Sequence, residues 1–196
     1  LIDHHASPSC IEGSLDLLEE GAAEVGLRAV FCYETTDRNG RDGRDAGLRE
    51  NRRYLQKIRQ RAEAGGEPRG GRRFAGLAGA HAAFTCADGA LEATAALAAE
   101  FGAGAHLHAA EDPCDDRLCR ERYGAPLAER LERAGLFTPE TLFVHGTHLD
   151  AAALARLREC GATLAHNPRS NMNNAVGYAP AAALREQILL GTDGIG

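Results

Sequence analysis

The sequence contains no long hydrophobic run and only one lysine. No stretch approaches the roughly 18 uncharged apolar residues of a membrane-spanning helix, which predicts that the protein has no membrane partner. Lys57 is the single lysine among 22 basic residues, and the formal net charge is −6. A general nucleic-acid-binding protein carries a basic surface instead, so we expect no nucleic-acid partner either.

Leader and disulfide signals are also missing. The chain begins at Leu1 without a methionine, and it lacks the basic segment and apolar core of a secretory signal peptide. The six cysteines are scattered, and even the closest pair, Cys114 and Cys119, does not have CxxC spacing. We therefore expect reduced thiols in a cytoplasmic protein. The abrupt ends of the chain lead us to expect a fragment.

Helix and strand signals alternate along the whole chain. Apolar residues at helical spacing predict helices, and short apolar runs rich in strand formers predict strands buried on both faces. We predict strands over residues 1–4, 27–33, 74–79, 104–109, 141–145, 162–166 and 187–192. We predict helices over residues 11–25, 48–64, 88–101, 117–134, 150–160 and 180–186, with Asp88 and Asp150 as N-caps. A polar loop is expected over 36–47, and a glycine-rich loop over 65–71.

This alternation predicts the α/β class, with parallel strands joined by crossover helices. A doubly wound sheet and a TIM barrel both fit it. No GxGxxG or phosphate loop follows an early strand, which argues against the nucleotide-binding version of the first. Polar residues repeatedly stand where strands end, as in the active sites of barrels. Since a full barrel takes about 250 residues, we expect an incomplete TIM-like (β/α)8 barrel.

Four consecutive predicted strands end in His108, His145, His166 and Asp193, and Glu111 follows the first of them. Each residue alone is a weak signal, because strand-end histidines are often structural and Asp-Gly is a common turn pair. Together, imidazole nitrogens and carboxylates suit zinc or a similar divalent ion. Such an ion lowers the pKa of a bound water to about 7, and a nearby carboxylate can carry protons to a leaving group.

Four short motifs contain these residues: HAAE over residues 108–111, VHGTHL over 144–149, HNPRSN over 166–171 and GTDG over 191–194. Together they resemble the motifs of the amidohydrolase superfamily. More narrowly, the sequence is similar to the deaminase and chlorohydrolase branch of that superfamily. IDHHASP over 2–8, CYETTDR over 32–38 and NMNNAVG over 171–177 resemble the SsnA group of aminohydrolases.

The resemblance implies one divalent metal ion, zinc in the first place and iron as the alternative. It implies that Glu111 moves a proton from water to the leaving nitrogen, and that His145 orients the attacking water or binds metal. Asp193 is implied to bind metal and to accept a proton. The implied metal ligands are His108, His145 and Asp193; the implied catalytic residues are Glu111, His145 and Asp193; the implied substrate contacts are His81, His166 and Asn167. A structural role is an equal alternative for His81.

One departure from the family pattern is large. The family's first strand carries a His-x-His pair that supplies two metal ligands, and no such pair precedes His4. His4 and His5 cannot replace it, because adjacent residues of a strand point to opposite faces. The resemblance therefore implies that residues 1–196 are a partial barrel domain. This domain would hold about strands 2 to 8, without the first strand and the flanking β-sandwich.

The function implied by the resemblance is metal-dependent hydrolysis of a carbon–nitrogen bond other than a peptide bond. Deamination of a heterocyclic amine or amidine is the main expectation, with a small molecule as the substrate. Hydrolytic dechlorination or ring opening in the same site is the enzymatic alternative. A catalytically incomplete fragment or pseudoenzyme is the third interpretation, which the missing His-x-His pair favours. A homo-oligomer is compatible with all three.

Overall fold

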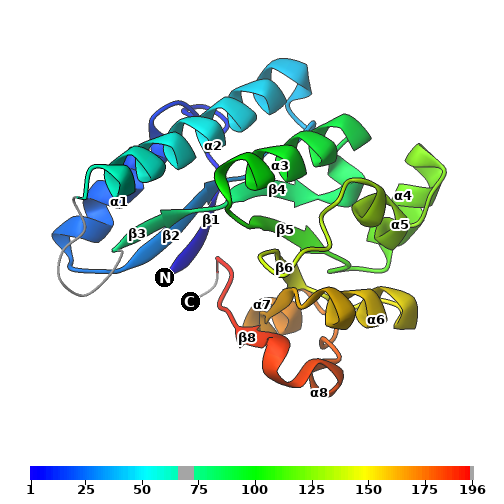
Figure 1. Ribbon diagram of the computed structural model, residues 1–196. Helices are drawn as coiled ribbons and strands as arrows, with labels where there is room; N and C mark the ends of the chain where they lie inside the picture. Colours follow the sequence, from blue (N-terminus) through cyan, green and yellow to red (C-terminus); the bar gives the residue numbers. More distant parts are fainter. Residues whose placement is uncertain (66–72, 195–196) are drawn as a thin grey trace.

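The computed structural model describes residues 1–65 and 73–194, and its strands alternate with helices along the chain (Figure 1). Every strand pair in this part of the chain is parallel. The strands are β1 (Ile2–His5), β2 (Ala29–Tyr33), β3 (Phe74–Gly76), β4 (Ala78–Ala82), β5 (Ala105–Ala109), β6 (Leu142–His145), β7 (Thr163–His166) and β8 (Ile188–Leu190). The α/β prediction is confirmed.

The helices cover the outside of the strands. They are α1 (Ser14–Glu24), α2 (Gly40–Glu63), α3 (Asp88–Phe101), α4 (Cys114–Tyr123), α5 (Leu127–Arg133), α6 (Ala151–Cys160), α7 (Pro168–Asn173) and α8 (Ala181–Leu184), with 3-10 turns at Ala83–Thr85 and Arg185–Gln187. The glycine-rich loop predicted over 65–71 lies almost entirely outside the described residues.

The strands form one curved wall in which β3 and β4 share a single path. The hydrogen-bonded orders are β1-β2-β3 and β4-β5-β6-β7-β8. The chain changes partner between β3 and β4: Leu77 N donates to Phe31 O on β2, and Ala78 N donates to Gly104 O before β5. A bridge between Thr35 and Ala80 ties β4 back to the β2 side. Together β3 and β4 take the place of the single strand predicted over residues 74–79.

The junction between the two parts of the wall is tight. A Cβ atom on Gly79 would lie 2.3 Å from the Tyr33 carbonyl oxygen, so only glycine fits there. The buried Asn51 of α2 spans the same junction: its Oδ1 accepts from Tyr33 N at 2.8 Å. Its Nδ2 donates to Tyr33 O at 2.8 Å, and to Thr35 Oγ1 and Gly79 O at 3.2 Å each. One amide therefore satisfies backbone groups of both β2 and β4.

Two clusters of buried apolar side chains lie on either side of this junction. The smaller one packs α1 and α2 on β2 and β3 and includes Phe31 and Tyr54. The larger one lies among β4 to β8 and their helices and includes Leu107. Helix α2 takes part in both, because Tyr54 belongs to the first cluster and its neighbour Leu55 to the second.

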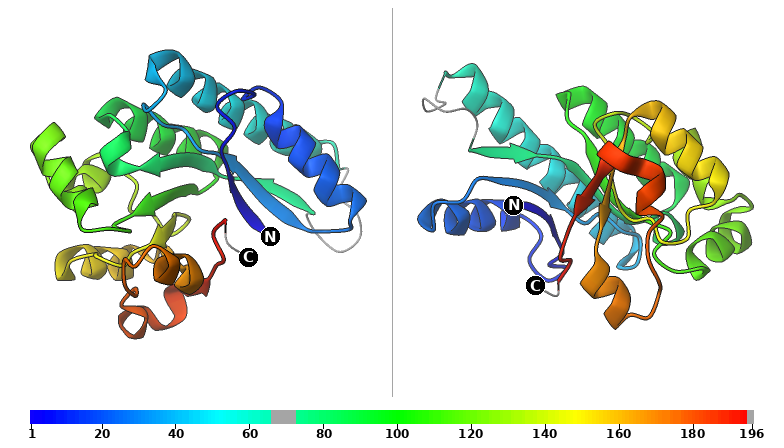
Figure 2. Two further views of the ribbon diagram at one scale, coloured as in Figure 1. Left: turned by 180° about the vertical axis from the view of Figure 1, so that it is seen from behind. Right: turned by 90° about the horizontal axis from the view of Figure 1, so that it is seen from below.

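The wall is open between its first and last strands. Within the described part of the chain, β1 pairs only with β2, and β8 pairs only with β7. The three views show β1 and the segment after β8 lying beside each other at this opening (Figures 1 and 2). Apolar side chains are exposed along it, with Leu190 81% and Ile2 45% accessible. Such edges are those of an incomplete barrel. No described helix combines the length and the apolar character needed to cross a membrane.

Two local predictions were wrong, and one helix was not predicted. Residues 40–47 belong to helix α2 and do not form a loop. Gly47 serves close packing within that helix, since a Cβ there would lie 3.1 Å from the Tyr33 ring. The helix predicted over 117–134 is two helices, since Gly124 ends α4 at a φ of 71° and Pro126 precedes α5. Residues 168–173 form the helix α7, in a segment for which no element was predicted.

The two N-cap predictions had different outcomes. Asp150 caps α6 as predicted, because its carboxylate accepts from Ala153 N at 2.8 Å. Asp88 is the first residue of α3 and makes no cap. Its carboxylate instead accepts from the buried Arg130 at 2.8 Å.

The Asn51 junction predicts a stability effect. Asn51→Ala removes the side-chain partner of the buried Tyr33 N and O, whereas Gly79 O still accepts from Thr35 N, and an unpaired buried group costs about 1–3 kcal/mol. We expect the free energy of unfolding to fall by at least about 2 kcal/mol in urea titrations. The exposed Gln56 on the same helix provides the control, since Gln56→Ala should change it by less than about 0.5 kcal/mol. Equal effects of the two variants would contradict the role of Asn51.

Candidate active site

The sequence-predicted residues gather at one rim of the wall. In a parallel sheet all carboxyl ends lie on the same side, and the residues in question stand at or just after these ends. His81 lies on β4, His108 near the end of β5, His145 at the end of β6 and His166 at the end of β7. Glu111 follows β5, Asn167 follows β7 and Asp193 follows β8.

His145 is the centre of this group. It is 1% exposed, and its backbone has a φ of 71°, in the left-handed region that a non-glycine residue adopts at a cost. Asn171 of α7 holds its ring: Asn171 Nδ2 donates to Thr147 Oγ1 at 3.0 Å, which leaves Asn171 Oδ1 to face His145 Nδ1 at 3.0 Å. His145 Nδ1 therefore carries a hydrogen and donates, so that in the neutral ring the lone pair is on Nε2.

Two carboxylates face this free nitrogen. Glu111 Oε2 lies 3.6 Å and Asp193 Oδ2 lies 3.9 Å from His145 Nε2. Asp193 also has a left-handed φ, of 57°, and it is held by Ser170, whose hydroxyl donates to Oδ2 at 2.6 Å. The site thus brings together the three residues predicted to be catalytic.

Glu111 is held from both sides. Its backbone N donates to Asp115 Oδ2 at 3.1 Å, and its Oε1 accepts from Asn174 Nδ2 at 3.1 Å. Ala110, just before it, has a φ of 52°. Burial raises the pKa of the Asp115 carboxyl to about 6. A strained turn at Ala110 and a side-chain anchor at Asn174 together direct the Glu111 carboxylate toward His145.

Beside His145 lies a cluster of buried imidazoles. The rings of His4 and His106 are 4.5 Å apart, those of His4 and His108 4.7 Å, and those of His108 and His81 5.1 Å. His106 and His108 lie on one face of β5, as their spacing predicts, whereas His5 turns to the other face of β1 and bonds Ser7 Oγ at 2.9 Å. The prediction that His4 and His5 cannot act as a pair is confirmed.

Burial keeps these rings neutral. Burial, followed by the neighbouring His108, lowers the pKa of His106 to about 3. Burial, then Arg38 and His145, lowers the pKa of His81 to about 4. Burial and neighbouring histidines hold the pKa of His4 and of His108 well below the ordinary value. Neutral imidazoles with free lone pairs are the form that binds metal ions.

The predicted substrate contacts occupy different places on the rim. His81 faces the cluster, and its Nδ1 bonds Thr85 Oγ1 at 2.6 Å. His166 is 7% exposed and lies against Asn171 and the ring of Tyr178. Asn167 is 3% exposed, at the start of α7. His81 and His166 lie on opposite sides of His145.

The donor set fits a divalent metal ion, although the predicted ligands are not equally close. His108 and His145 have ring centroids 5.4 Å apart, and Asp193 approaches His145 and not His108. Among the residues that the structure describes, the group whose ligand atoms all lie within 4.8 Å of one another is His4, Glu34 and His108. Imidazole nitrogens and carboxylate oxygens of this kind suit zinc or iron.

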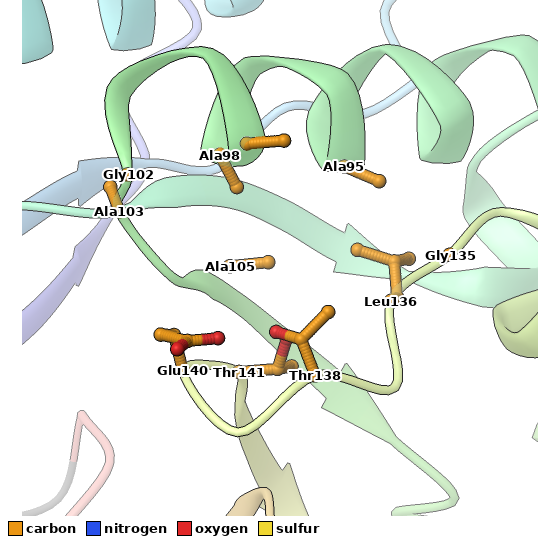
Figure 3. A pocket seen from close by; sticks show the side chains of 11 residues that line it. Ala95, Ala98, Gly102, Ala103, Ala105, Gly135, Leu136, Thr138, Glu140 and Thr141 are labelled. Atoms are coloured by element: carbon orange, nitrogen blue, oxygen red, sulfur yellow. The ribbon is translucent and has the colours of Figure 1, made fainter. Parts of the chain in front are cut away.

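Two hollows of the surface lie at the opposite end of the strands. The larger has a volume of about 290 Å³ and is lined mostly by alanine, glycine and threonine of α3, β5 and the loop before β6 (Figure 3). Ala105, at the start of β5, lines it, whereas His108 stands near the end of the same strand. A second hollow of about 200 Å³ is lined by residues such as Leu77 and Leu189. Neither contains the predicted site residues.

Sequence reasoning missed the residues that hold the site. Asn171 and Ser170 were included only in the HNPRSN motif over residues 166–171, without a role of their own. Pro168 at the first position of α7 is the signal that could have predicted a helix there. Glu34 and Arg38 lie in the CYETTDR segment, but neither they nor Asp115 were given a role, because their roles depend on which strands come together.

The chain matches the family model described as "Amidohydrolase family" over residues 1–196. The 5'-deoxyadenosine deaminase of Methanopyrus kandleri is 31% identical over 187 residues, which are 92% of this chain and 40% of that protein. The 5'-deoxyadenosine deaminase of Methanosarcina mazei is 31% identical over 183 residues, again 92% and 40%. The chain therefore spans about two fifths of the length of these curated relatives.

Solved structures share the fold. An adenosine deaminase from Xanthomonas campestris with bound zinc has a TM-score of 0.78 at 24% identity, over 91% of this chain and 40% of that one. An atrazine chlorohydrolase from Arthrobacter aurescens TC1 complexed with zinc has a TM-score of 0.79 at 18% identity, over 97% and 44%. The chain belongs to the amidohydrolase family, and the incomplete barrel is confirmed. The narrower likeness to the SsnA group stays a prediction.

The neutral imidazoles predict a pH-dependent stability, to be measured with a chelator present. His106 has a folded pKa of about 3, whereas an unfolded histidine titrates near about 6.5. The folded state binds fewer protons between these values, so the free energy of unfolding falls as the pH falls from about 6.5 toward 3. His106→Gln should reduce this slope by up to about 1.4 kcal/mol per pH unit between about pH 6 and about pH 4.5.

Leu107→Met is the control for that measurement. It disturbs the packing of the same strand without removing a titratable group, so it should lower stability and leave the slope unchanged. An unchanged slope in His106→Gln would contradict the assignment of a neutral buried imidazole.

Proposed function

We propose that these residues are part of a metal-dependent hydrolase that removes an amino group from a heterocyclic amine. The observation that carries the proposal is the convergence of Glu111 and Asp193 on His145 Nε2, at 3.6 and 3.9 Å. The names of the curated relatives support an adenine-type nucleoside as the first substrate to test.

The proposed metal ligands are His108, His145 and Asp193. A divalent ion, zinc in the first place and iron as the alternative, supplies Lewis acidity that lowers the pKa of water to about 7. The neutral state of His108 and the carboxylate of Asp193 support this role, as do the zinc ions in the two solved relatives.

The proposed reaction assigns a separate task to each side chain. His145 has only Nε2 free, because Nδ1 is occupied by Asn171, and this nitrogen would either bind the ion or accept a hydrogen bond from the attacking water. Glu111 takes a proton from that water and delivers it to the leaving nitrogen. The water oxygen bonds to the ring carbon, the carbon–nitrogen bond breaks, and ammonia leaves. Asp193 accepts the second proton of the water and passes it to a ring nitrogen of the product, so both carboxylates return to their ionised state. His81, His166 and Asn167 are proposed to contact the substrate.

We propose that residues 1–196 form part of a larger barrel domain. The first strand and a flanking β-sandwich would belong to the same protein outside residues 1–196. The unpaired sides of β1 and β8 support this proposal, as does the coverage of about two fifths of the relatives' length.

The proton-transfer role of Glu111 can be tested directly in the protein that carries this chain. Glu111→Gln should lower kcat for ammonia release from 5'-deoxyadenosine or adenosine by about 10²- to 10⁴-fold. The zinc content should stay unchanged, because Glu111 is not a proposed ligand. Glu121→Gln, on the exposed face of α4, is the matched control and should keep full activity. Undiminished turnover in Glu111→Gln would overturn the role, and chloride release from atrazine without ammonia release would favour dechlorination.

Asn171 should act as a positioning residue for His145. Asn171→Ala removes the acceptor at Nδ1, so the ring can take the other tautomer, and kcat should fall by about 10- to 100-fold. Asn171→Asp keeps an oxygen at that position and should restore part of the loss with little change in KM. The exposed Asn173→Ala is the control. Equal activities of Asn171→Ala and Asn171→Asp would indicate a purely structural role.

A further inference from the structure

His4 is buried at the rim without a hydrogen-bond partner. Its side chain is 8% exposed, and neither ring nitrogen bonds to any group among the residues described. A neutral imidazole has one N–H donor and one lone pair. Leaving both unused in a buried position is unfavourable, which points to a group that occupies the space in front of the ring.

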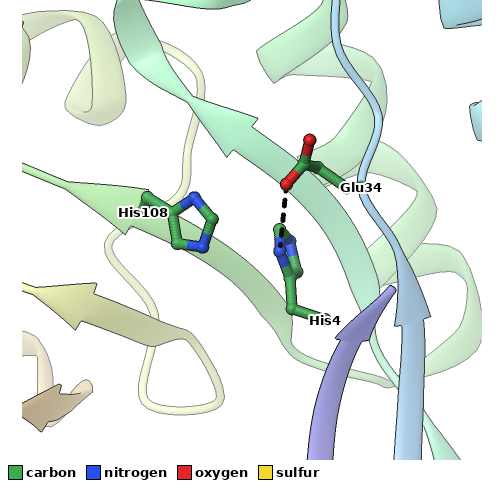
Figure 4. Close-up of side chains that lie close together, drawn as sticks. All are labelled: His4, Glu34 and His108. Carbon is green, nitrogen blue, oxygen red and sulfur yellow. Dashed lines mark ion pairs between the residues drawn. The ribbon is translucent and has the colours of Figure 1, made fainter. Parts of the chain in front are cut away.

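Glu34 and His108 border that space. Glu34 Oε2 lies 3.7 Å from His4 Nδ1, which is too long for a hydrogen bond, while the other oxygen of Glu34 accepts from Arg38. The three side chains come from the end of β1, the residue after β2 and the end of β5, and they point toward one another (Figure 4). One ligand atom from each lies within 4.8 Å of the other two.

The chemistry and spacing of the three side chains favour a divalent cation in this space. Two imidazoles and one carboxylate are ligands that a zinc-type ion prefers, and the side chains of His4 and Glu34 are at most one-tenth exposed. Two ligands of a tetrahedral zinc ion with bonds of about 2.1 Å lie roughly 3.4 Å apart, close to the 3.7 Å between His4 and Glu34.

We infer that His4, Glu34 and His108 form a binding site for a divalent transition-metal ion of the zinc type. The site lies on the β1 and β2 side of the rim and does not use His145 or Asp193. His108 stands between the two groups, since its ring centroid is 4.7 Å from that of His4 and 5.4 Å from that of His145. Its neutral ring has one lone pair, so it serves either this ion or the one proposed beside His145 and Asp193, and not both at once. The inference does not rest on the proposed deamination.

Arg38 competes with the ion for Glu34. Its side chain is half exposed, so it can leave Glu34 for solvent when an ion binds. Removing the arginine should therefore tighten ion binding, an effect that mere damage to the fold would not produce.

The test is a titration of Co²⁺ into the intact metal-stripped protein that carries this chain, followed by visible absorption. His4→Gln and Glu34→Gln should each weaken one bound equivalent by at least tenfold, and Arg38→Gln should tighten it about threefold. Asp193→Asn should leave this equivalent in place. His5→Gln, the adjacent residue on the other face of β1, is the matched control and should bind like the parent.

Two results would overturn the site. One is parental stoichiometry and affinity in both His4→Gln and Glu34→Gln. The other is loss of the same equivalent in Asp193→Asn, which would show one ion held by the other group. If His4→Gln does not fold by circular dichroism, Glu34→Gln and Arg38→Gln decide. Ammonia release is measured separately, so failure of the deaminase proposal leaves this result unaffected.

Discussion

Parallel pairing of every described strand is the constraint on which the site depends. It sends the carboxyl end of each strand to the same rim, so that short polar segments distant in sequence meet without any long loop. His145, Glu111 and Asp193 come from three different strand ends and face one another across a few ångströms. The same geometry explains why the hollows at the other rim are lined by alanine and leucine and contain none of these groups.

Crowded imidazoles set the electrostatic character of the rim. Several rings within about 5 Å of one another cannot all be charged, so the protein keeps them neutral and uses hydrogen bonds to decide which nitrogen carries the hydrogen. Asn171 makes that choice for His145, and Thr85 contacts His81. Neutral donors beside carboxylates are an arrangement suited to binding a cation.

The sequence predicts the strand ends well, because apolar runs and the polar residues that follow them are local features. His108, His145, His166 and Asp193 are found where this pattern places them. The pattern does not predict that His4 on β1 meets His108 on β5, because that contact depends on the curvature of the wall between them. The pattern also predicts a loop at Gly47 and an unbroken helix across Gly124, and both predictions are wrong. Glycine serves tight packing at Gly47 and ends a helix at Gly124. Local sequence does not distinguish the two uses.

The two separate clusters of buried side chains have a consequence for the motions of the molecule. Helices α1 and α2 with β2 and β3 bury one cluster, and β4 to β8 bury the other, so each is a candidate unit for local opening. Asn51, the α2 side chains and the backbone hydrogen bonds around Thr35 connect the two across the junction. Slow separation of the first unit would take Glu34, and β1 with His4, away from the rim while Glu111, His145 and Asp193 kept their places. The two halves of the rim would then exchange ions and solvent on different timescales.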